Sequence, residues 1–191
     1  MKDQLLIIFV KNPELGKAKT RLAATIGDEA ALEVYKRLLK KTMEVTRELT
    51  QDKTVFYNQF VDDKDLWSSE HYSKKLQIQG DLGEKMHHAF EWAFDEGYKD
   101  VCIIGSDCFD LSEQIIDRAF QTLRQNDAVI GPSEDGGYYL LGLSKFLPEV
   151  FTNKKWSTES VCDDTIQDFK KAGCRFEIID TLNDIDTEKD L

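Results

Sequence analysis

A basic loop follows the first apolar stretch of a chain that is otherwise strongly acidic. Residues 11–21 hold four cations and one acid, whereas the 191 residues together carry 36 acids and 25 bases, a formal net charge of −11. Lys17, Lys19 and Arg21 alternate just after Gly16, and a glycine lets the backbone approach a ligand closely. Arginine grips phosphate with two parallel hydrogen bonds and lysine supplies a point charge. The loop therefore predicts a diphosphate cradle; the alternative is a solvated basic loop that balances the acidic surface.

The two common nucleotide-binding signatures are absent from the sequence. No G-x-x-x-x-G-K-[ST] is present, since Lys17 is followed by Ala18, and no G-x-G-x-x-G occurs. Those glycines are required for the tight turns on which the two phosphate sites depend. Neither a P-loop hydrolase nor a dinucleotide oxidoreductase is therefore favoured.

Acidic side chains follow two other apolar stretches. Asp107 comes three residues after the segment 101–104, and the segment 183–191 near the C-terminus holds several more carboxylates. Mg²⁺ is commonly bound by one or two carboxylates together with substrate phosphates. We expect Asp107 to hold a metal. Asp110 would cap the next turn, and the C-terminal segment would supply a second carboxylate or simply begin an acidic helix.

Alternating strand and helix patterns must position these loops. We expect strands at 5–10, 54–57, 76–78, 101–104, 128–130, 138–141 and 176–179, the sixth of them antiparallel after a tight turn at 135–137. We expect a polar loop over 11–27, and helices that begin near Asp28, Gly83, Ser112 and Thr158. This order predicts an α/β fold with a mostly parallel sheet covered on both faces, in a single domain over residues 1–191.

Ligands of open α/β sheets bind beyond the carboxyl ends of the strands. The loops 11–21, 105–111 and 180–190 all meet that condition. If the first and fourth strands are neighbours, their loops share one crevice.

Several motifs together resemble a known family. In order along the chain they occupy residues 11–22, 80–86 (GDLGEKM), 105–108 (GSDC), 131–140 (GPSEDGGYYL) and 184–187 (DIDT). As a set they resemble a bacterial glycosyltransferase-like family of unassigned substrate, within the nucleotide-diphospho-sugar transferase superfamily. The resemblance covers essentially the whole chain and extends to the guanylyltransferases and cytidylyltransferases of cofactor synthesis.

The resemblance implies a three-layer α/β/α sandwich of the Rossmann-like GT-A type, with a mixed sheet. It implies that Lys11, Asn12, Pro13, Gly16, Lys17, Lys19, Thr20 and Arg21 hold base and phosphates, joined by Asp81 and Gly83 at the start of a helix. It assigns Mg²⁺ or Mn²⁺ to Asp107 and Asp186, and the acceptor side to Asp135, Gly136, Gly137 and Tyr138. Asp81 and Gly83 also read as an ordinary helix start. Trp156, Ser157 and Thr158 fit either an acceptor pocket or the packing at the start of a helix, and we favour packing for Trp156.

Three functions fit these residues. The first is a metal-dependent glycosyltransferase, in which Asp135 orients or deprotonates the acceptor hydroxyl. The second is a nucleotidyltransferase that releases pyrophosphate, and the third is a non-catalytic nucleotide-binding domain. Phe109 stands where relatives commonly have proline, and Asp107-x-x-Asp110 is not the D-x-D of many glycosyltransferases. The glycine-poor basic loop favours sugar transfer.

Composition limits the partners. The negative charge opposes nucleic acid and anionic membranes, and the longest apolar run, 5–10, is too short to span a bilayer. Four cysteines without a C-x-x-C pair predict free thiols, and three histidines predict no zinc site. We expect a cytoplasmic protein whose partners are a nucleotide or nucleotide-sugar and an acceptor that the sequence does not identify.

Overall fold

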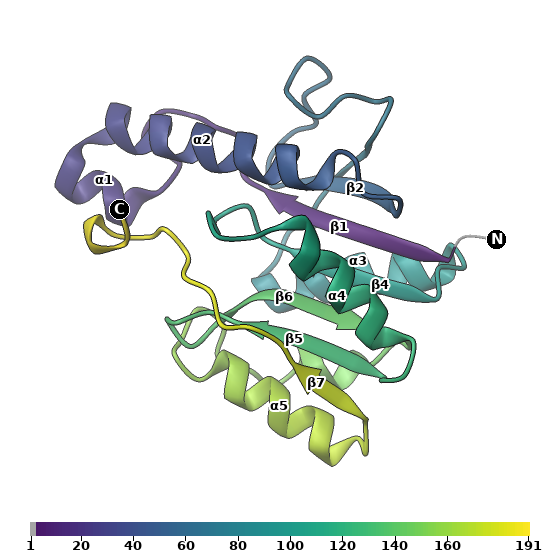
Figure 1. The fold of residues 1–191 in the computed structure, drawn as a ribbon. Helices are drawn as coiled ribbons and strands as arrows, with labels where there is room; N and C mark the ends of the chain where they lie inside the picture. The colour runs from purple at the N-terminus through teal and green to yellow at the C-terminus, as the bar shows by residue number, and fades with distance from the viewer. Residues whose placement is uncertain (1–2) are drawn as a thin grey trace.

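Seven strands form one mixed sheet in the computed structural model, which describes residues 3–191. The strand order is β3-β2-β1-β4-β6-β5-β7, and only β6 runs antiparallel to its neighbours. The strands are β1 (Gln4–Val10), β2 (Asp52–Tyr57), β3 (Ser73–Leu76), β4 (Asp100–Ile104), β5 (Ala128–Pro132), β6 (Tyr138–Leu143) and β7 (Phe176–Ile178). Figure 1 shows the reversed arrow of β6 inside the sheet. The α/β class and the antiparallel strand are as predicted.

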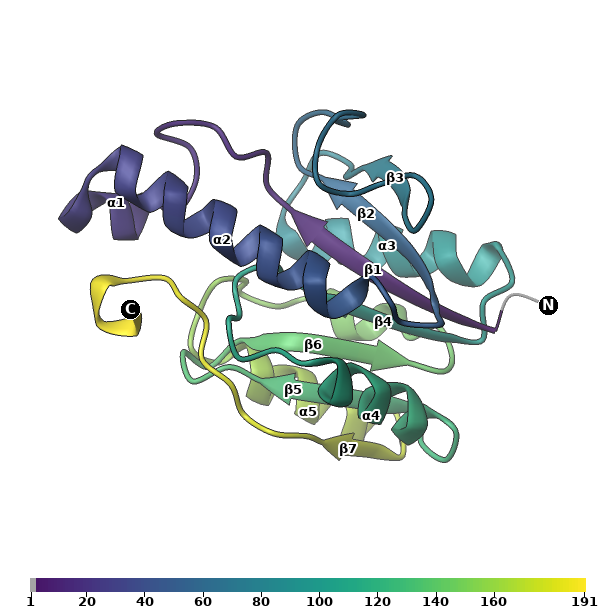
Figure 2. The ribbon, with the colours of Figure 1, turned by 45° about the horizontal axis from the view of Figure 1, so that its top comes forward.

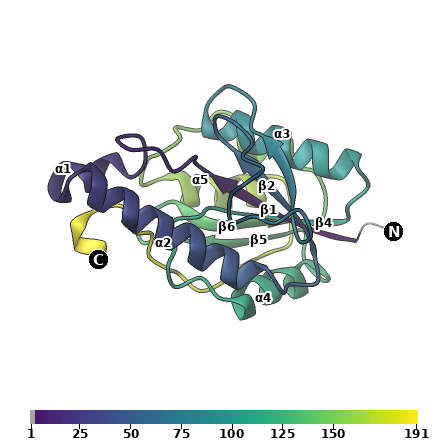
Figure 3. The same cartoon turned by 90° about the horizontal axis from the view of Figure 1, so that it is seen from above.

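Helices cover both faces of this sheet. They are α1 (Thr20–Ile26), α2 (Asp28–Thr46), α3 (Leu82–Asp95), α4 (Glu113–Leu123) and α5 (Val161–Lys171), with 3₁₀ turns at Pro148–Phe151 and Glu188–Asp190. Apolar side chains of α2 and α4 pack on one face and those of α3 and α5 on the other. The three layers are visible in Figures 2 and 3. They confirm the predicted sandwich.

Central strands are apolar on both sides because both faces are covered. Leu5, Leu6, Ile7 and Ile8 of β1 are fully buried and alternate between the two cores. Burial of such a side chain contributes about 1.5–3 kcal/mol, so the continuous apolar run is a direct product of the layered architecture.

Several predicted boundaries are wrong. Part of the expected loop 11–27 is helix α1, which the sequence pattern did not reveal because it is only seven residues long and buries only Leu22. Asp28 is the first residue of α2 and not its cap, which is Gly27 at φ +87°.

The third strand lies at 73–76 and not at 76–78. It is an edge strand, and its lysines are held by local partners: Lys74 pairs with Asp65 at 2.7 Å, and Lys75 lies 4.4 Å from the centre of the Trp92 ring. The strand therefore consists mostly of polar residues, as is common at the edge of a sheet, and it lacks the apolar pattern by which a strand is predicted.

Two helix starts also differ. Helix α3 begins at Leu82, because Asp81 and Glu84 form a reciprocal capping box. Helix α5 begins at Val161, three residues later than expected. The four cysteines are free and buried, as predicted.

The sheet brings the predicted loops together. Strand β1 pairs in parallel with both β2 and β4, so the loops after β1 and β4 leave the sheet side by side. This meets the condition stated above for a shared crevice. The C-terminal segment runs back to the same edge and contacts α1 (Figure 1). Within residues 3–191, no helix combines the length and the hydropathy that a membrane span requires.

Candidate active site at the carboxyl edge of the sheet

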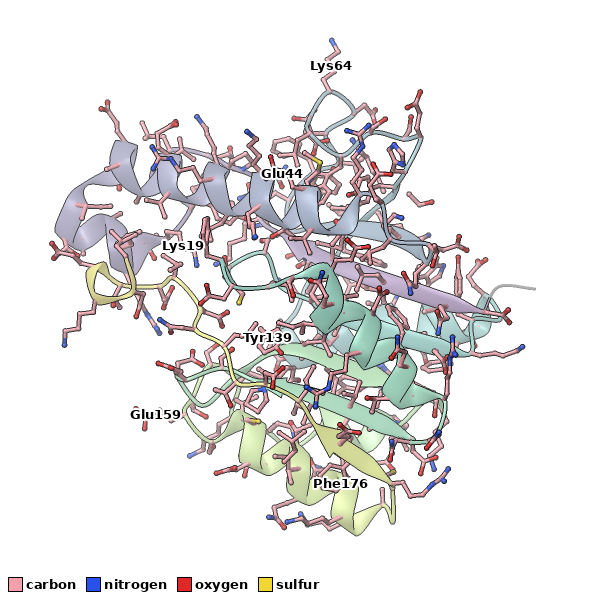
Figure 4. All side chains as sticks on the ribbon, viewed as in Figure 1. Lys19, Glu44, Lys64, Tyr139, Glu159 and Phe176 are labelled. Carbon is pink, nitrogen blue, oxygen red and sulfur yellow. The ribbon has the colours of Figure 1, made fainter. Side chains whose placement is uncertain are left out.

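A cavity of about 1580 Å³ opens at this edge of the sheet. Its walls come from the loops after β1 and β4, the start of α3, the turn before β6, the residues before α5 and the C-terminal segment. Figure 4 labels Lys19, Tyr139 and Glu159, all of which line this cavity.

Two cations and two carboxylates form an ion-pair cluster at one end. The ammonium group of Lys19 lies 2.9 Å from Oδ1 of Asp107 and 3.9 Å from Oδ1 of Asp186. The guanidinium group of Arg21 donates to Oδ2 of Asp186 at 2.8 Å. The lysine side chain is only 5 % exposed, whereas both carboxylates are about 40 % exposed. The two carboxylates are therefore accessible to a ligand, whereas the lysine side chain is buried.

Local backbone structure holds this cluster. Lys19 has a left-handed backbone, with φ +51°, immediately before helix α1 begins. The loop after β4 is joined to the C-terminal segment: the amide of Ile185 donates to the carbonyl of Asp107 at 3.0 Å, and Cys108 and Asp184 form an antiparallel bridge. Three segments distant in sequence are thereby fixed against one another.

Asp184 is a further carboxylate that the sequence pattern did not single out. Its Oδ2 accepts from the hydroxyl of Ser133 at 2.9 Å. Burial raises the pKa of Asp184 to about 6, and the like charges of Asp107 and Asp135 add to the rise. A carboxyl in such surroundings is costly to ionise. Asp184 opens the 184–187 motif, but the resemblance assigned the metal to Asp186, two residues later.

The Asp107–Asp186 pair fits a divalent cation. Both carboxylates already contact one positive centre, the ammonium of Lys19. Within residues 3–191, no three His, Cys, Asp or Glu side chains group as a metal site. A Mg²⁺ or Mn²⁺ ion would therefore take its remaining oxygen ligands from water and substrate phosphates, which is common for Mg²⁺.

Tyr35 of α2 ties the loop after β1 to the loop after β4. Its hydroxyl accepts from the amide of Lys11 at 2.8 Å, donates to the carbonyl of Lys11 at 3.1 Å and lies 3.2 Å from the hydroxyl of Ser106. Burial raises the pKa of Tyr35 well above its usual range. It stays neutral and links the two loops by hydrogen bonds. This role depends on β1 and β4 being neighbours in the sheet, which the spacing of residues in the sequence does not show.

Two amide side chains line the cavity beyond the neighbouring strands. Asn58 follows β2 and Gln77 follows β3, and the register places Tyr57 beside Leu76. Oδ1 of Asn58 accepts from the amide of Asn12 at 2.8 Å, and Nε2 of Gln77 donates to the carbonyl of Phe56 at 2.9 Å. Each amide is therefore oriented, so that Nδ2 of Asn58 and Oε1 of Gln77 have no hydrogen-bond partner among the residues that the structure describes.

A glycine turn forms the other end of the cavity. Oδ1 of Asp135 accepts from the amide of Gly137 at 2.9 Å, which stabilises the turn into β6. Gly136 has φ +86°, and a Cβ there would lie 2.1 Å from the carbonyl oxygen of Glu159. The carbonyl of Gly136 in turn accepts from the amide of Cys162 at 2.9 Å. The turn is thus locked against the residues that lead into α5.

The cavity brings together ten of the predicted site residues and leaves six outside its lining. Those that line it are Lys11, Lys19, Thr20, Arg21, Asp107, Asp135, Gly136, Gly137, Tyr138 and, from the C-terminal segment, Asp186. Those that do not are Asn12, Pro13, Gly16, Lys17, Asp81 and Gly83.

Structural roles account for several of these outer residues. Asn12 is buried and donates to the carbonyl of Phe60 at 3.0 Å. Lys17 pairs with Glu14 at 3.1 Å on the surface. Asp81 caps α3, and Gly83 makes room for Trp156, which the sequence assigned to packing and which also lines the cavity.

Known proteins share this fold and part of this sequence. A protein from Desulfovibrio desulfuricans, provisionally named a nucleotide-diphospho-sugar transferase, is 34 % identical, with a TM-score of 0.89 over 98 % of this chain and 84 % of that one. Among the curated proteins, none matches the sequence.

More distant solved structures agree in fold alone. A 4-diphosphocytidyl-2C-methyl-D-erythritol synthase from Anaerococcus prevotii is 13 % identical, with a TM-score of 0.62 over 99 % of this chain and 92 % of that one. A Mycobacterium tuberculosis protein in complex with manganese is 11 % identical, with a TM-score of 0.58 over 100 % of this chain and 96 % of that one.

The family model described as an uncharacterized protein conserved in bacteria, DUF2064, matches residues 40–158, which is more than half of the sequence. The 34 % identical structure agrees with this match over 98 % of the chain. The chain belongs to the DUF2064 family.

Proposed function

We propose that the protein is a metal-dependent transferase that uses a nucleotide-activated donor, with glycosyl transfer as its reaction. The observation that supports this most directly is the ion-pair cluster, in which Lys19 contacts both Asp107 and Asp186 at the carboxyl edge of the sheet. The name of the 34 % identical relative agrees with this class of reaction.

The charges of the cluster suit a departing nucleoside diphosphate. In the proposed reaction the acceptor oxygen bonds to the donor sugar carbon, and the bond from that carbon to the diphosphate breaks. The diphosphate takes the electron pair, and Lys19 and Arg21 stabilise the charge that develops on it. A Mg²⁺ or Mn²⁺ ion on Asp107 and Asp186 would supply further neutralisation of that charge.

The two oriented amides suit the base of the donor. Nδ2 of Asn58 is a hydrogen-bond donor and Oε1 of Gln77 is an acceptor, and both residues line the cavity beyond the ends of β2 and β3. A nucleobase edge presents the complementary acceptor and donor. We place the base at this side of the ion-pair cluster.

Asp135 is placed to handle the proton of the acceptor hydroxyl. One of its carboxylate oxygens is held by the amide of Gly137, which leaves the second oxygen to orient the hydroxyl and take its proton. A general base must lie within hydrogen-bond reach of that proton, and Asp135 lines the cavity from which the acceptor would approach.

Nucleotidyl transfer is a second candidate. Four cations line the cavity, Lys11, Lys19, Arg21 and Lys85, and a departing pyrophosphate carries more charge than a departing nucleoside diphosphate. Here the acceptor oxygen would attack the α-phosphate of a nucleoside triphosphate. Nucleoside diphosphate as product supports the first reaction, and pyrophosphate supports the second.

Calorimetric binding of nucleoside di- and triphosphates and sugar nucleotides, each with and without Mn²⁺, tests the proposal. We expect one base to bind, and Mn²⁺ to increase its affinity at least about tenfold, which corresponds to about 1.4 kcal/mol. Asp107→Asn should abolish the Mn²⁺ effect. Asp110→Asn, which removes a carboxylate from the same loop but outside the cavity lining, is the matched control.

Two results would contradict the proposal. Absence of binding across the panel, by folded protein, would reject the nucleotide assignment. Metal-independent binding with neither product formed would instead support a non-catalytic nucleotide-binding domain.

A further inference from the structure

The cavity has a second end with a chemistry different from the ion-pair cluster. We call it the turn end and define it as the cavity-lining residues of 134–139 and 156–161. Three carboxylates line it, Glu134, Asp135 and Glu159, and Lys85 of α3, next to Met86, lines the same cavity. An anionic ligand group would therefore meet net negative charge here.

Trp156 gives the turn end a large apolar surface. Its indole lies directly against Gly83 of α3: a Cβ on that glycine would be 2.2 Å from Nε1. The missing side chain is therefore what allows the ring to lie at this position. Two neighbours from α3, Leu82 and Met86, line the same cavity one helical turn apart, and Leu82 is 42 % exposed.

Backbone strain surrounds this tryptophan. Asn153 and Ser157 both have left-handed backbones, with φ +55° and φ +61°. Such a conformation costs roughly 1 kcal/mol or more for serine, whereas asparagine adopts it more readily. Close contacts of the indole with Gly83 and of the Glu159 backbone with Gly136 hold this segment against α3 and the glycine turn.

Hydroxyl and carboxylate groups line the cavity together with Trp156. Ser157 and Thr158 line the cavity directly after Trp156, and Asp135 and Glu159 face the same space from adjoining positions, since the glycine turn packs on the backbone of Glu159. Carboxylates and hydroxyls accept or exchange hydrogen bonds with ligand hydroxyls. A flat apolar surface beside such groups matches a ring that has an apolar face and a hydroxylated rim.

We propose that the turn end binds the acceptor, and that the acceptor is an uncharged, hydroxylated ring of the sugar class whose C–H face stacks on Trp156. The identification of this ligand as the acceptor rests on the proposed transferase function. The binding site itself does not depend on nucleotide binding. Asp135 then lies beside the ring hydroxyls, which agrees with its proposed role in proton transfer.

Saturation-transfer NMR with three small probes tests the proposal on the whole protein. Methyl β-D-glucopyranoside and its galactoside analogue supply an uncharged ring, mannitol supplies hydroxyls without a ring, and glucose 6-phosphate adds an anion to the ring. We expect at least one glycoside to bind, and we expect mannitol and glucose 6-phosphate to bind at least about tenfold more weakly, a difference of about 1.4 kcal/mol.

Three variants assign the effect to the indole. Trp156→Leu should weaken glycoside binding at least about tenfold, and Trp156→Tyr should retain most of it because an aromatic face remains. Trp92→Leu is the matched control: the same substitution on α3, at a ring that packs on Phe56 and does not line the cavity. Circular dichroism on each variant confirms that it is folded.

The outcomes separate this inference from the proposed function. Nucleotide binding without binding of any glycoside would overturn the acceptor site and leave the nucleotide site intact. Glycoside binding that Trp156→Leu abolishes, in a protein that binds no nucleotide, would retain the site and reject the transferase. Tighter binding of glucose 6-phosphate than of the glycosides would overturn the uncharged acceptor.

Discussion

The ion-pair cluster and the turn end lie in one cavity but are built in different ways. The cluster joins Lys19, Asp107 and Asp186, residues from three segments that meet only through the strand order of the sheet. The turn end depends on close steric contacts. Glycines at 83 and 136 let an indole and a backbone carbonyl, respectively, approach the main chain. One region depends on charge and the other on the absence of side chains.

This difference separates the consequences of substitution. The Arg21–Asp186 pair is exposed and contributes little to folding, whereas the ammonium of Lys19 is buried and its removal also costs folding free energy. Close backbone contacts act mainly on the fold, since a new Cβ must displace its neighbours. We therefore expect variants of the ion-pair cluster to lose activity while folded, and variants of the turn glycines to lose stability first.

Removal of the buried ammonium should have the largest effect on activity. Lys19→Gln leaves Asp107 and Asp186 without their shared cation and removes one positive charge from the proposed leaving group. Loss of one preorganised electrostatic contact typically lowers kcat by about 100–1000-fold. Steady-state turnover of the donor identified by the binding panel measures it. A loss of less than about threefold would show that the lysine is only structural.

The turn glycines should show the largest effect on stability. In Gly136→Ala the new Cβ meets the carbonyl oxygen of Glu159 at 2.1 Å, whereas in Gly97→Ala nothing lies within 4 Å. Both glycines have similar positive φ, +86° and +91°, so the pair isolates the steric contact from backbone strain. We expect losses of about 1 kcal/mol for Gly97→Ala and about 3 kcal/mol for Gly136→Ala in urea unfolding. Equal losses would mean that the turn relaxes freely.

The sequence predicted the charged residues of the cavity better than their supports. The loop 11–21 and Asp107 were evident because charge contrast and the strand-end rule depend on local pattern alone. Tyr35, Asn58 and Gln77 were missed, since each acquires its role only when β1, β2, β3 and β4 lie in their observed order. A strand can be predicted from its own residues, but its neighbours cannot.

Local pattern also failed where an element was too short or too polar to show it. Helix α1 has a single buried residue, Leu22, and edge strand β3 contains two lysines. Lys19 and Lys17 looked alike in sequence, yet the backbone turn before α1 buries the first and leaves the second in solvent. Burial, which separates the two, is a tertiary property.

A smaller effect concerns a carboxylate beside the ion-pair cluster. Asp184 has a pKa raised to about 6 by burial and by nearby carboxylates, above its value in an unfolded chain, about 3.9. The folded state therefore holds its proton more tightly, and stability falls as pH rises from about 4 to about 6.

The variant Asp184→Asn removes this effect. In chelator-treated protein we expect it to be more stable than the parent by about 1–2 kcal/mol at pH 8, with a smaller difference near pH 4. Thermal unfolding at the two pH values measures it. A variant that is less stable at pH 8 would show that the carboxylate contributes more through Ser133 than burial costs.

The smallest effect belongs to Lys17, two residues before the buried lysine. Its side chain is 56 % exposed and pairs only with Glu14, three residues earlier, and such surface pairs contribute about 0–1 kcal/mol. Lys17→Gln should change the free energy of unfolding by less than about 0.5 kcal/mol and donor affinity by less than about twofold. Calorimetry beside Lys19→Gln makes the comparison at equal change in net charge. If both variants weakened binding equally, the loop would act through its total charge, and the contacts of Lys19 with Asp107 and Asp186 would not be what distinguishes the site.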